Sequence, residues 1–161
     1  MNASIFQINK KPEIIDEVGL PKISIEKADI TKMGVNGDFN RFRKKKKNDD
    51  PNMALVILST DIIEQLNIEG WPVKPGDLGE NLTLGDIEYG ELAPGKKYLI
   101  GSVEIKITFI CDPCSNLKVL PYVGNSRIAK FIKTLMKRRG WYAKVLKEGS
   151  IIKGDLVIPI K

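Results

Sequence analysis

Short strand-like runs separated by Gly, Pro and Asp turns dominate the pattern of hydrophobic and polar positions. Residues 23–30 and 103–109 alternate apolar and polar side chains, as half-buried strands do. In the second run the apolar side chains share one face, and these are Val103, Ile105, Ile107 and Phe109. Residues 54–58 are continuously apolar, which is typical of a strand buried on both faces. With further strands expected at 141–146 and 155–160, the pattern predicts a mostly β protein built as a barrel or a sandwich.

Two helices are expected to interrupt the strands. Residues 59–67 begin with capping residues and then place apolar side chains on one side. Residues 126–140 carry a stripe at helical spacing, made of Ile128, Phe131, Ile132, Leu135 and Met136. Ser126 can cap the start of this helix. The basic residues 137–139 would complement the dipole in its last turn, and Gly140 would stop it.

A basic segment, "GDFNRFRKKKKNDDPN" at residues 37–52, fits neither period and is expected to be an exposed loop. Six of its residues between positions 41 and 47 are basic. Arginine matches phosphate oxygens in a bidentate manner, so Arg41 or Arg43 could hold a phosphate. The alternative is that the whole run is solvated and aids solubility.

Composition narrows the chemistry. The chain has 161 residues, a formal net charge of +6 and no histidine. His-containing catalytic triads, His-ligated zinc and a His general base are therefore excluded. The length predicts one domain over residues 1–161. No apolar stretch is long enough for a membrane span and no secretory signal is recognisable, so we expect a cytoplasmic protein. The basic charge weakly favours an anionic partner.

The only two cysteines, Cys111 and Cys114, are three positions apart. A structural zinc site needs four ligands and this chain offers two thiolates. A thioredoxin-type pair would open a helix in a βαβ context, whereas this pair follows a sheet-like strand. From residue type alone, two inert free thiols remain the simplest interpretation, because free cysteine often behaves as a small hydrophobe.

An ordered set of motifs changes that interpretation. The chain contains, in this order, "GLPK" (19–22), "MGVNGD" (33–38), "PGDLGENLT" (75–83), "APGKKYLIGSVEIKITFICDPC" (93–114), "GWYAKVL" (140–146) and "GSIIKGDLV" (149–157). Together these motifs resemble the MOSC family, whose domain forms the C-terminus of molybdenum cofactor sulfurase and also occurs as small stand-alone proteins. The resemblance covers nearly the whole chain.

The resemblance implies a β-barrel-like fold with a few short helices and a signature cysteine after a proline, which here is Cys114. In the family this thiol is proposed to carry sulfur as a persulfide, received from a pyridoxal-phosphate cysteine desulfurase. In molybdenum-dependent relatives it ligates the metal of the molybdenum cofactor (molybdopterin), and the reaction can be reduction of N-hydroxylated small molecules. Either role suits a thiolate, which is both a sulfur nucleophile and a soft metal ligand.

The chain departs from the family at two positions. Many relatives have an arginine where Cys111 stands, so this chain loses one cationic contact and gains a potential resolving thiol beside Cys114. Relatives often have a histidine where Asn40 stands, and a role that needed an imidazole there is lost.

Other residues are candidates for the site around Cys114. We expect Arg41, Arg43 and Lys118 to contact anionic groups of the cofactor, with Asp38 beside them. Glu80 and Asn81 belong to the "PGDLGENLT" motif and would shape the pocket, although a purely structural turn is an equal alternative. Gly76 and Gly79 of that motif suit backbone positions that need positive φ or a close approach.

Two functions from other classes compete with this hypothesis. The basic residues 41–47 and the outer face of the helix at 126–139 could neutralise nucleic-acid phosphates, although no stacking motif supports this. A non-catalytic subunit of a cofactor-handling complex is the third class. Under the favoured hypothesis, the partner is a cysteine desulfurase or a molybdenum cofactor enzyme, and no membrane is involved.

Overall fold

The structure, a computed structural model, describes residues 2–161 and combines many strands with three α-helices in that range. The α-helices are α1 (Arg41–Lys46), α2 (Thr60–Ile68) and α3 (Gly124–Leu135), and the short 3-10 helices are η1 (Pro51–Met53), η2 (Tyr89–Glu91) and η3 (Ser115–Val119). The strands are β1 (Ser4–Lys10), β2 (Ile23–Ile25), β3 (Lys27–Thr31), β4 (Gly34–Val35), β5 (Leu55–Ser59), β6 (Leu82–Gly85), β7 (Lys97–Ile100), β8 (Val103–Ile110), β9 (Trp141–Lys147), β10 (Gly149–Ile152) and β11 (Val157–Ile160). No helix in the described residues is long and apolar enough to span a membrane.

The strands form two sheets, and neither closes into the barrel that we expected. An eight-stranded sheet has the order β11-β7-β8-β9-β5-β6-β1-β2, and a three-stranded sheet has the order β10-β3-β4. Strand β1 already pairs with β2 and with β6. Since β2 covers only Ile8 to Lys10, the same edge of β1 before Ile8 lies against the chain that leads into β11. There it makes one isolated bridge, Ser4 with Leu156, and no ladder with β11. The fold is therefore mixed α/β and strand-rich, with open sheets.

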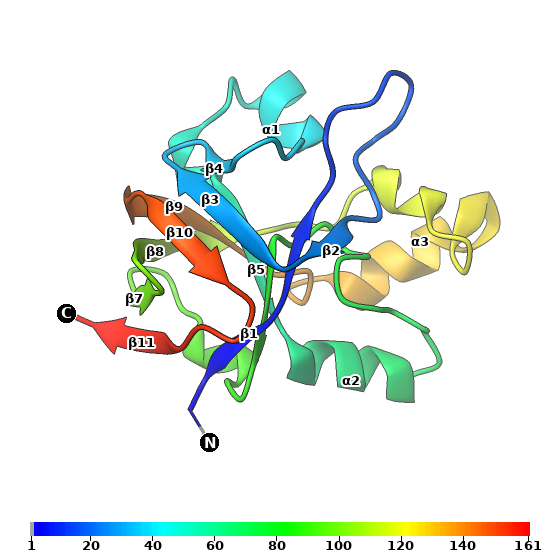
Figure 1. Cartoon of the computed structure of the whole chain (residues 1–161). Helices are drawn as coiled ribbons and strands as arrows, with labels where there is room; N and C mark the ends of the chain where they lie inside the picture. The colour runs from blue at the N-terminus through cyan, green and yellow to red at the C-terminus, as the bar shows by residue number, and fades with distance from the viewer. Residues whose placement is uncertain (1) are drawn as a thin grey trace.

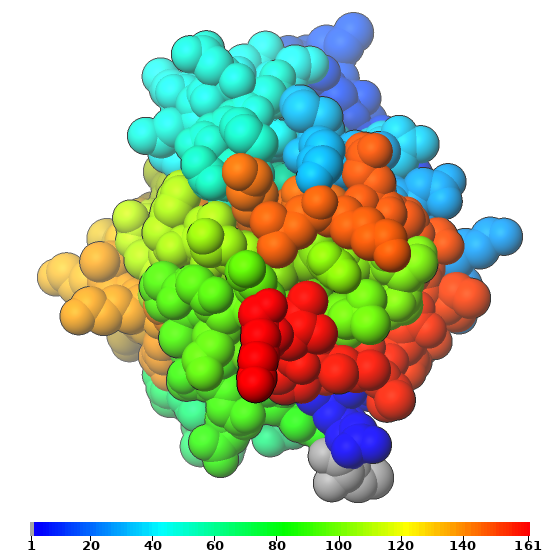
Figure 2. Space-filling view, turned by 90° about the vertical axis from the view of Figure 1, so that its left-hand side faces the viewer, coloured from blue at the N-terminus to red at the C-terminus, as the bar shows by residue number. Residues whose placement is uncertain are grey.

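The elements surround two main apolar clusters. The first lies between the sheets and gathers side chains such as Ile8, Ile57 and Ile105. The second, with Phe131 and Leu135, lies where α2, α3 and η3 cover the large sheet. In Figure 1, α2 and α3 lie at the bottom and right, whereas α1 stands apart at the top. Figure 2 shows the red C-terminal strand at the surface beside the green segment that contains β7, in agreement with their pairing.

The predicted strand at 23–30 is split at Glu26. Its first part, β2, joins the large sheet through β1, and its second part, β3, joins the small sheet through β10. The chain bends at Glu26, so one alternating run passes from one sheet to the other. The alternation of apolar and polar residues over 23–30 correctly predicts β structure, but it gives no sign of the bend at Glu26.

Strand β8 confirms the predicted strand at 103–109, with one correction. Val103, Ile105 and Ile107 are buried as expected, but Phe109 is exposed. The register with β9 shifts between Ile107 and Ile110. Such a bulge rotates the following side chains out of the alternating pattern. Phe109 therefore faces outward and not into the core.

The helix expected at 126–140 ends five residues early. Helix α3 stops at Leu135, and Lys137 has a left-handed backbone with φ of 65°. The basic residues 137–139 are consequently outside the helix, and Ser126 is inside it rather than at its cap. The predicted helix at 59–67 is confirmed by α2.

The segment 37–52 is not simply an exposed loop. It contains α1, whose cap is the Asn40 side chain, which accepts a hydrogen bond from the Arg43 N–H, and also η1. Arg43 is buried and fixes the segment to the body of the protein, while Lys44 to Lys47 are exposed as expected.

The expected conformations of Gly76 and Gly79 are confirmed, and Gly76 makes the closer approach to backbone. Both have positive φ, and a Cβ on Gly76 would lie 2.6 Å from the Lys22 carbonyl oxygen. Gly95 has nearly the same φ, +90° against +93°, but nothing lies within 4 Å of its Cβ position.

We predict that Gly76→Ala lowers the free energy of unfolding by at least about 1 kcal/mol more than Gly95→Ala does. Both substitutions strain the backbone, and only the first adds a collision with backbone. Urea denaturation of the two variants measures the difference, and equal losses would contradict the packing argument.

Candidate functional site

The cysteines lie where β8 runs into η3. The Cys111 N–H donates to the Gly140 carbonyl over 2.9 Å, and Cys114 immediately precedes η3. Cys111 is buried and Cys114 is half-buried, and both are free thiols. The strand and the 3-10 helix therefore fix the two sulfur atoms at different depths.

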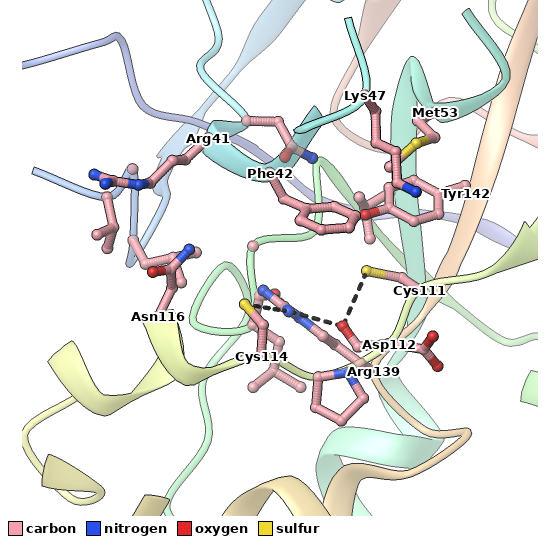
Figure 3. A pocket seen from close by; sticks show the side chains of 18 of the residues that line it. Arg41, Phe42, Lys47, Met53, Cys111, Asp112, Cys114, Asn116, Arg139 and Tyr142 are labelled. Atoms are coloured by element: carbon pink, nitrogen blue, oxygen red, sulfur yellow. Dashed lines mark hydrogen bonds between the residues drawn. The ribbon is translucent and has the colours of Figure 1, made fainter. Parts of the chain in front are cut away.

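A cavity of about 360 Å³ opens above both cysteines (Figure 3). Four stretches of the chain supply most of its wall, namely residues 18–22, 39–53, 78–79 and 109–116, with single side chains added by Val56, Arg139 and Tyr142. Figure 3 shows Arg41, Phe42 and Lys47 on one side of this space and Cys114 and Arg139 on the opposite side. A volume of this size accepts a small organic ligand.

Arg139 is the side chain that connects the parts of the site. Its Nε donates to the Leu78 carbonyl over 3.0 Å, and its Nη1 donates to the Asp112 carbonyl over 3.0 Å and to Cys114 Sγ over 3.3 Å. No carboxylate within residues 2–161 forms an ion pair with it. Burial opposes the charged guanidinium, yet the sulfur atoms of Cys111 and Cys114 outweigh that cost and raise the pKa of Arg139.

Of the two sulfur atoms, that of Cys114 is the one that lies half-buried in the cavity wall and contacts the Arg139 guanidinium. Burial raises the pKa of the Cys111 thiol, and the nearby Arg139 guanidinium only partly opposes this effect. Burial also raises the pKa of Tyr142. Cys111 is therefore a protonated thiol at neutral pH. A thiolate beside a cationic side chain is the reactive form of cysteine, and Cys114 is the more exposed cysteine with such a neighbour.

The two candidate arginines have different positions. Arg41 is exposed and lines the cavity. Arg43 lies outside that cavity, and its three nitrogen atoms donate to the carbonyls of Asp50, Met33 and Asp49 over 2.9, 2.6 and 3.1 Å. Burial lowers the pKa of Arg43. Its donors are used within the protein, so Arg43 anchors α1 and is not placed to contact a ligand in this cavity.

Asp38 and Asn81 lie behind the cavity wall and position Lys22, which lines the cavity. The Lys22 ammonium is 2.8 Å from Asp38 Oδ1, and the Asn81 side-chain amide donates to Asp38 Oδ2 over 2.9 Å. Asn81 Oδ1 accepts from the Val56 N–H over 3.1 Å. Asp38 and Asn81 thus fix Lys22 and the start of β5, and neither residue lines the cavity itself.

Glu80 is fully buried under the "PGDLGENLT" segment. Its Oε2 accepts from the Gly76 N–H over 3.0 Å and from the Thr83 hydroxyl over 2.9 Å, while Oε1 has no partner among the described residues. Burial raises its pKa to about 7. Glu80 therefore holds the loop that presents the Leu78 carbonyl to Arg139, and it does not face the cavity.

Lys118 is exposed on η3 and lies outside the cavity, whereas Asn116 on the same 3-10 helix lines it. The structure thus brings Cys111, Cys114 and Arg41 together and places the other candidates around them. Sequence reasoning missed the roles of Arg139, Asn116 and Lys22. The place of Arg139 directly before "GWYAKVL" and that of Lys22 in "GLPK" were the available signals.

The described residues contain no group of three Cys, Asp or Glu side chains that could hold a metal ion. A metal held by Cys114 would thus take its other ligands from a cofactor. The donor set fits such a group, because it offers one soft sulfur ligand, Arg41 for an anionic part and Asn116 for polar contacts. The Lys22 ammonium is buried and already paired with Asp38, so it is not available to a ligand.

Residues 44–158 match the MOSC domain family, and the chain belongs to this family. Among solved structures, it resembles YiiM from Geobacillus stearothermophilus with a TM-score of 0.74 at 21% identity, covering 99% of this chain and 75% of that one. The chain also resembles YuaD from Bacillus subtilis, with a TM-score of 0.78 at 16% identity, covering 98% of this chain and 94% of that one. For YiiM from Escherichia coli the TM-score is 0.70 at 18% identity, and the match covers 100% of this chain and 70% of that one. These likenesses establish the fold. No curated protein sequence matches the chain.

We predict that replacing the Arg139 guanidinium slows alkylation of Cys114 at neutral pH. In a Cys111→Ser background, Arg139→Met should reduce the iodoacetamide rate about tenfold or more, because a hydrogen bond to a charged group contributes roughly 1.5–3 kcal/mol. Arg138→Met is the matched control, since Arg138 pairs with Glu69 at the surface. Equal rates in both variants would mean that Arg139 does not stabilise the thiolate.

We predict that Glu80→Gln removes a pH dependence of stability. A carboxyl whose folded pKa is raised to about 7 stabilises the fold below its ordinary value of 4.5 and loses this contribution as the pH rises through 7. Between pH 4.5 and 8 the wild type should lose roughly 3 kcal/mol relative to Glu80→Gln. Urea denaturation at both pH values measures this, with Glu64→Gln on the surface of α2 as control. Parallel curves for wild type and Glu80→Gln would contradict the assignment.

Proposed function

We propose that this protein acts in molybdenum cofactor and sulfur-transfer chemistry through the thiolate of Cys114. The observation that carries the proposal is the 3.3 Å contact between Arg139 Nη1 and Cys114 Sγ, at a guanidinium that has no carboxylate partner within residues 2–161. Membership of the MOSC family supports the type of chemistry. The half-buried position of Cys114 in the cavity wall leaves the sulfur accessible.

As a sulfur acceptor, Cys114 reacts with a persulfide on a donor protein, for which a pyridoxal-phosphate cysteine desulfurase is suited. The Cys114 thiolate attacks the outer sulfur of the donor persulfide. A new S–S bond forms on Cys114, the donor S–S bond breaks, and the donor cysteine leaves as a thiolate. Arg139 stabilises the attacking thiolate. The exchange needs no external oxidant or reductant.

The cavity volume favours a second use of the same thiolate. A space of about 360 Å³ is larger than a single transferred sulfur atom requires and suits a pterin-sized cofactor. Cys114 would ligate its molybdenum, and Arg41 and Asn116 would hold its anionic and polar parts. When bound, the metal supplies two-electron chemistry such as reduction of an N-hydroxylated compound. The chain itself supplies the ligand, the neutralising charge and a partly enclosed space.

We predict that natively purified protein from molybdate-supplemented cells contains molybdenum and pterin, and that Cys114→Ser loses the metal while Cys111→Ser keeps it. Metal analysis and pterin fluorescence measure this. Incubation of the metal-free protein with polysulfide, followed by intact mass, tests the sulfur acceptor. A Cys114→Ser variant that retains full metal, combined with a wild type that takes up no sulfur, would overturn the proposal.

A further inference from the structure

Basic and aromatic side chains gather at the opening of the cavity. This mouth surface consists of Arg41, Phe42, Lys45, Lys46 and Lys47 from α1 and its C-terminal cap, and of Phe109 from β8. All six side chains are exposed. Three residues of this segment, Arg41, Phe42 and Lys47, line the cavity that leads to Cys114 (Figure 3). Any partner that reaches the thiolate from this side passes over these residues.

The positive charges of the mouth surface are not neutralised within the described part of the chain. Of the basic residues on α1 and its cap, only Lys44 forms a surface ion pair, with Glu13 at 2.7 Å. Arg41, Lys45, Lys46 and Lys47 form none there. Asp49 and Asp50 follow in the chain, but neither carboxylate forms an ion pair with these side chains. Four neighbouring like charges repel each other, and an acidic partner would relieve that repulsion.

The mouth surface is also held in place before any partner arrives. Arg43 ties α1 to the carbonyls of Met33, Asp49 and Asp50 through three hydrogen bonds. The Asn40 side chain caps the start of the helix. A surface that is already ordered loses less conformational entropy on binding.

The mouth surface also carries two exposed aromatic side chains, both of which line the cavity. Phe42 is 40% exposed and Phe109 is 43% exposed. The bulge in β8 turns Phe109 outward, and its ring packs on Tyr142 with centroids 5.3 Å apart. Aromatic and arginine side chains are enriched in protein–protein interfaces.

We propose that the mouth surface docks a protein with an acidic face, which delivers persulfide sulfur to Cys114. This inference rests on the sulfur-acceptor role proposed above. A nucleic acid fits the surface less well. Helix α1 has six residues and is about 9 Å long, which matches only about three phosphates of one strand. The other basic face, on α3, lies apart from α1 in Figure 1, so the two faces do not form one continuous surface for a nucleic acid. Figure 2 shows the cyan segment that carries α1 at the upper left of the molecule.

The test compares sulfur delivery by a protein and by a small molecule. All variants are made in a Cys111→Ser background, so that a mass gain of one sulfur reports on Cys114. One donor is an acidic pyridoxal-phosphate cysteine desulfurase with L-cysteine, and the other is polysulfide. Lys45→Glu with Lys46→Glu changes the mouth surface without touching the cavity wall. Lys130→Glu with Lys133→Glu makes the same charge change on the exposed face of α3.

We predict that at low salt the Lys45/Lys46 variant is loaded by the desulfurase at least about tenfold more slowly than the wild type, and that the gap narrows in high salt. The Lys130/Lys133 variant should stay within about twofold of the wild type. Polysulfide should load all three proteins equally, because a small donor needs no docking surface.

Each other result overturns a specific claim. If the desulfurase loads both charge variants equally slowly, the effect is one of net charge, and the claim that the mouth surface docks the donor is wrong. If polysulfide loads the protein without the Lys45 and Lys46 changes but the desulfurase does not, the docking role is also wrong, while the sulfur-acceptor role stands. No loading from either donor would overturn the sulfur acceptor itself. Loss of binding to a single-stranded DNA oligonucleotide by the Lys45/Lys46 variant, with unchanged desulfurase rates, would assign the surface to nucleic acid.

Discussion

The hydrogen bonds of the Arg139 guanidinium are the constraint on which the site depends. They join the loop carrying Leu78, the segment between β8 and η3, and the chain that follows α3. These three segments are far apart in sequence, and the hydrogen bonds of Arg139 hold them together. A buried guanidinium must be hydrogen-bonded and neutralised to be tolerated. The cavity wall, the loop position and the position of the Cys114 sulfur atom therefore all depend on one side chain.

The two buried arginines show how partners determine a role. Arg43 donates to three backbone carbonyls, and apart from a long contact to the Met33 sulfur it has no other acceptor, so its effect is to hold α1. Arg139 also donates to two carbonyls, but a further contact reaches a thiol in the cavity wall. Residue type alone favoured Arg43 as an anion contact and left Arg139 in a helix. Only the three-dimensional acceptors distinguish a structural guanidinium from one that acts on a reactive atom.

Periodicity predicted most strands and the position of the two longer helices, because apolar spacing reports directly on which face is buried. It failed where the backbone departs from a regular repeat. The bend at Glu26, the bulge after Ile107 and the stop at Leu135 leave no mark on hydrophobic spacing. Each of the last two places a side chain in the cavity wall, Phe109 and Arg139 respectively. The motif resemblance located Cys114, but it could not show that Glu80 and Asn81 act from behind the wall.

The bulge in β8 divides a single strand into two parts with different surroundings. Up to Ile107 the apolar side chains fill the core, where a change in volume affects the whole fold. Beyond the shift, Phe109 lines the opening of the cavity and packs on Tyr142. Together with Phe42 on α1, it belongs to a surface that can be substituted while the sheet beneath it stays the same. The strand thus uncouples what approaches Cys114 from the scaffold that holds it.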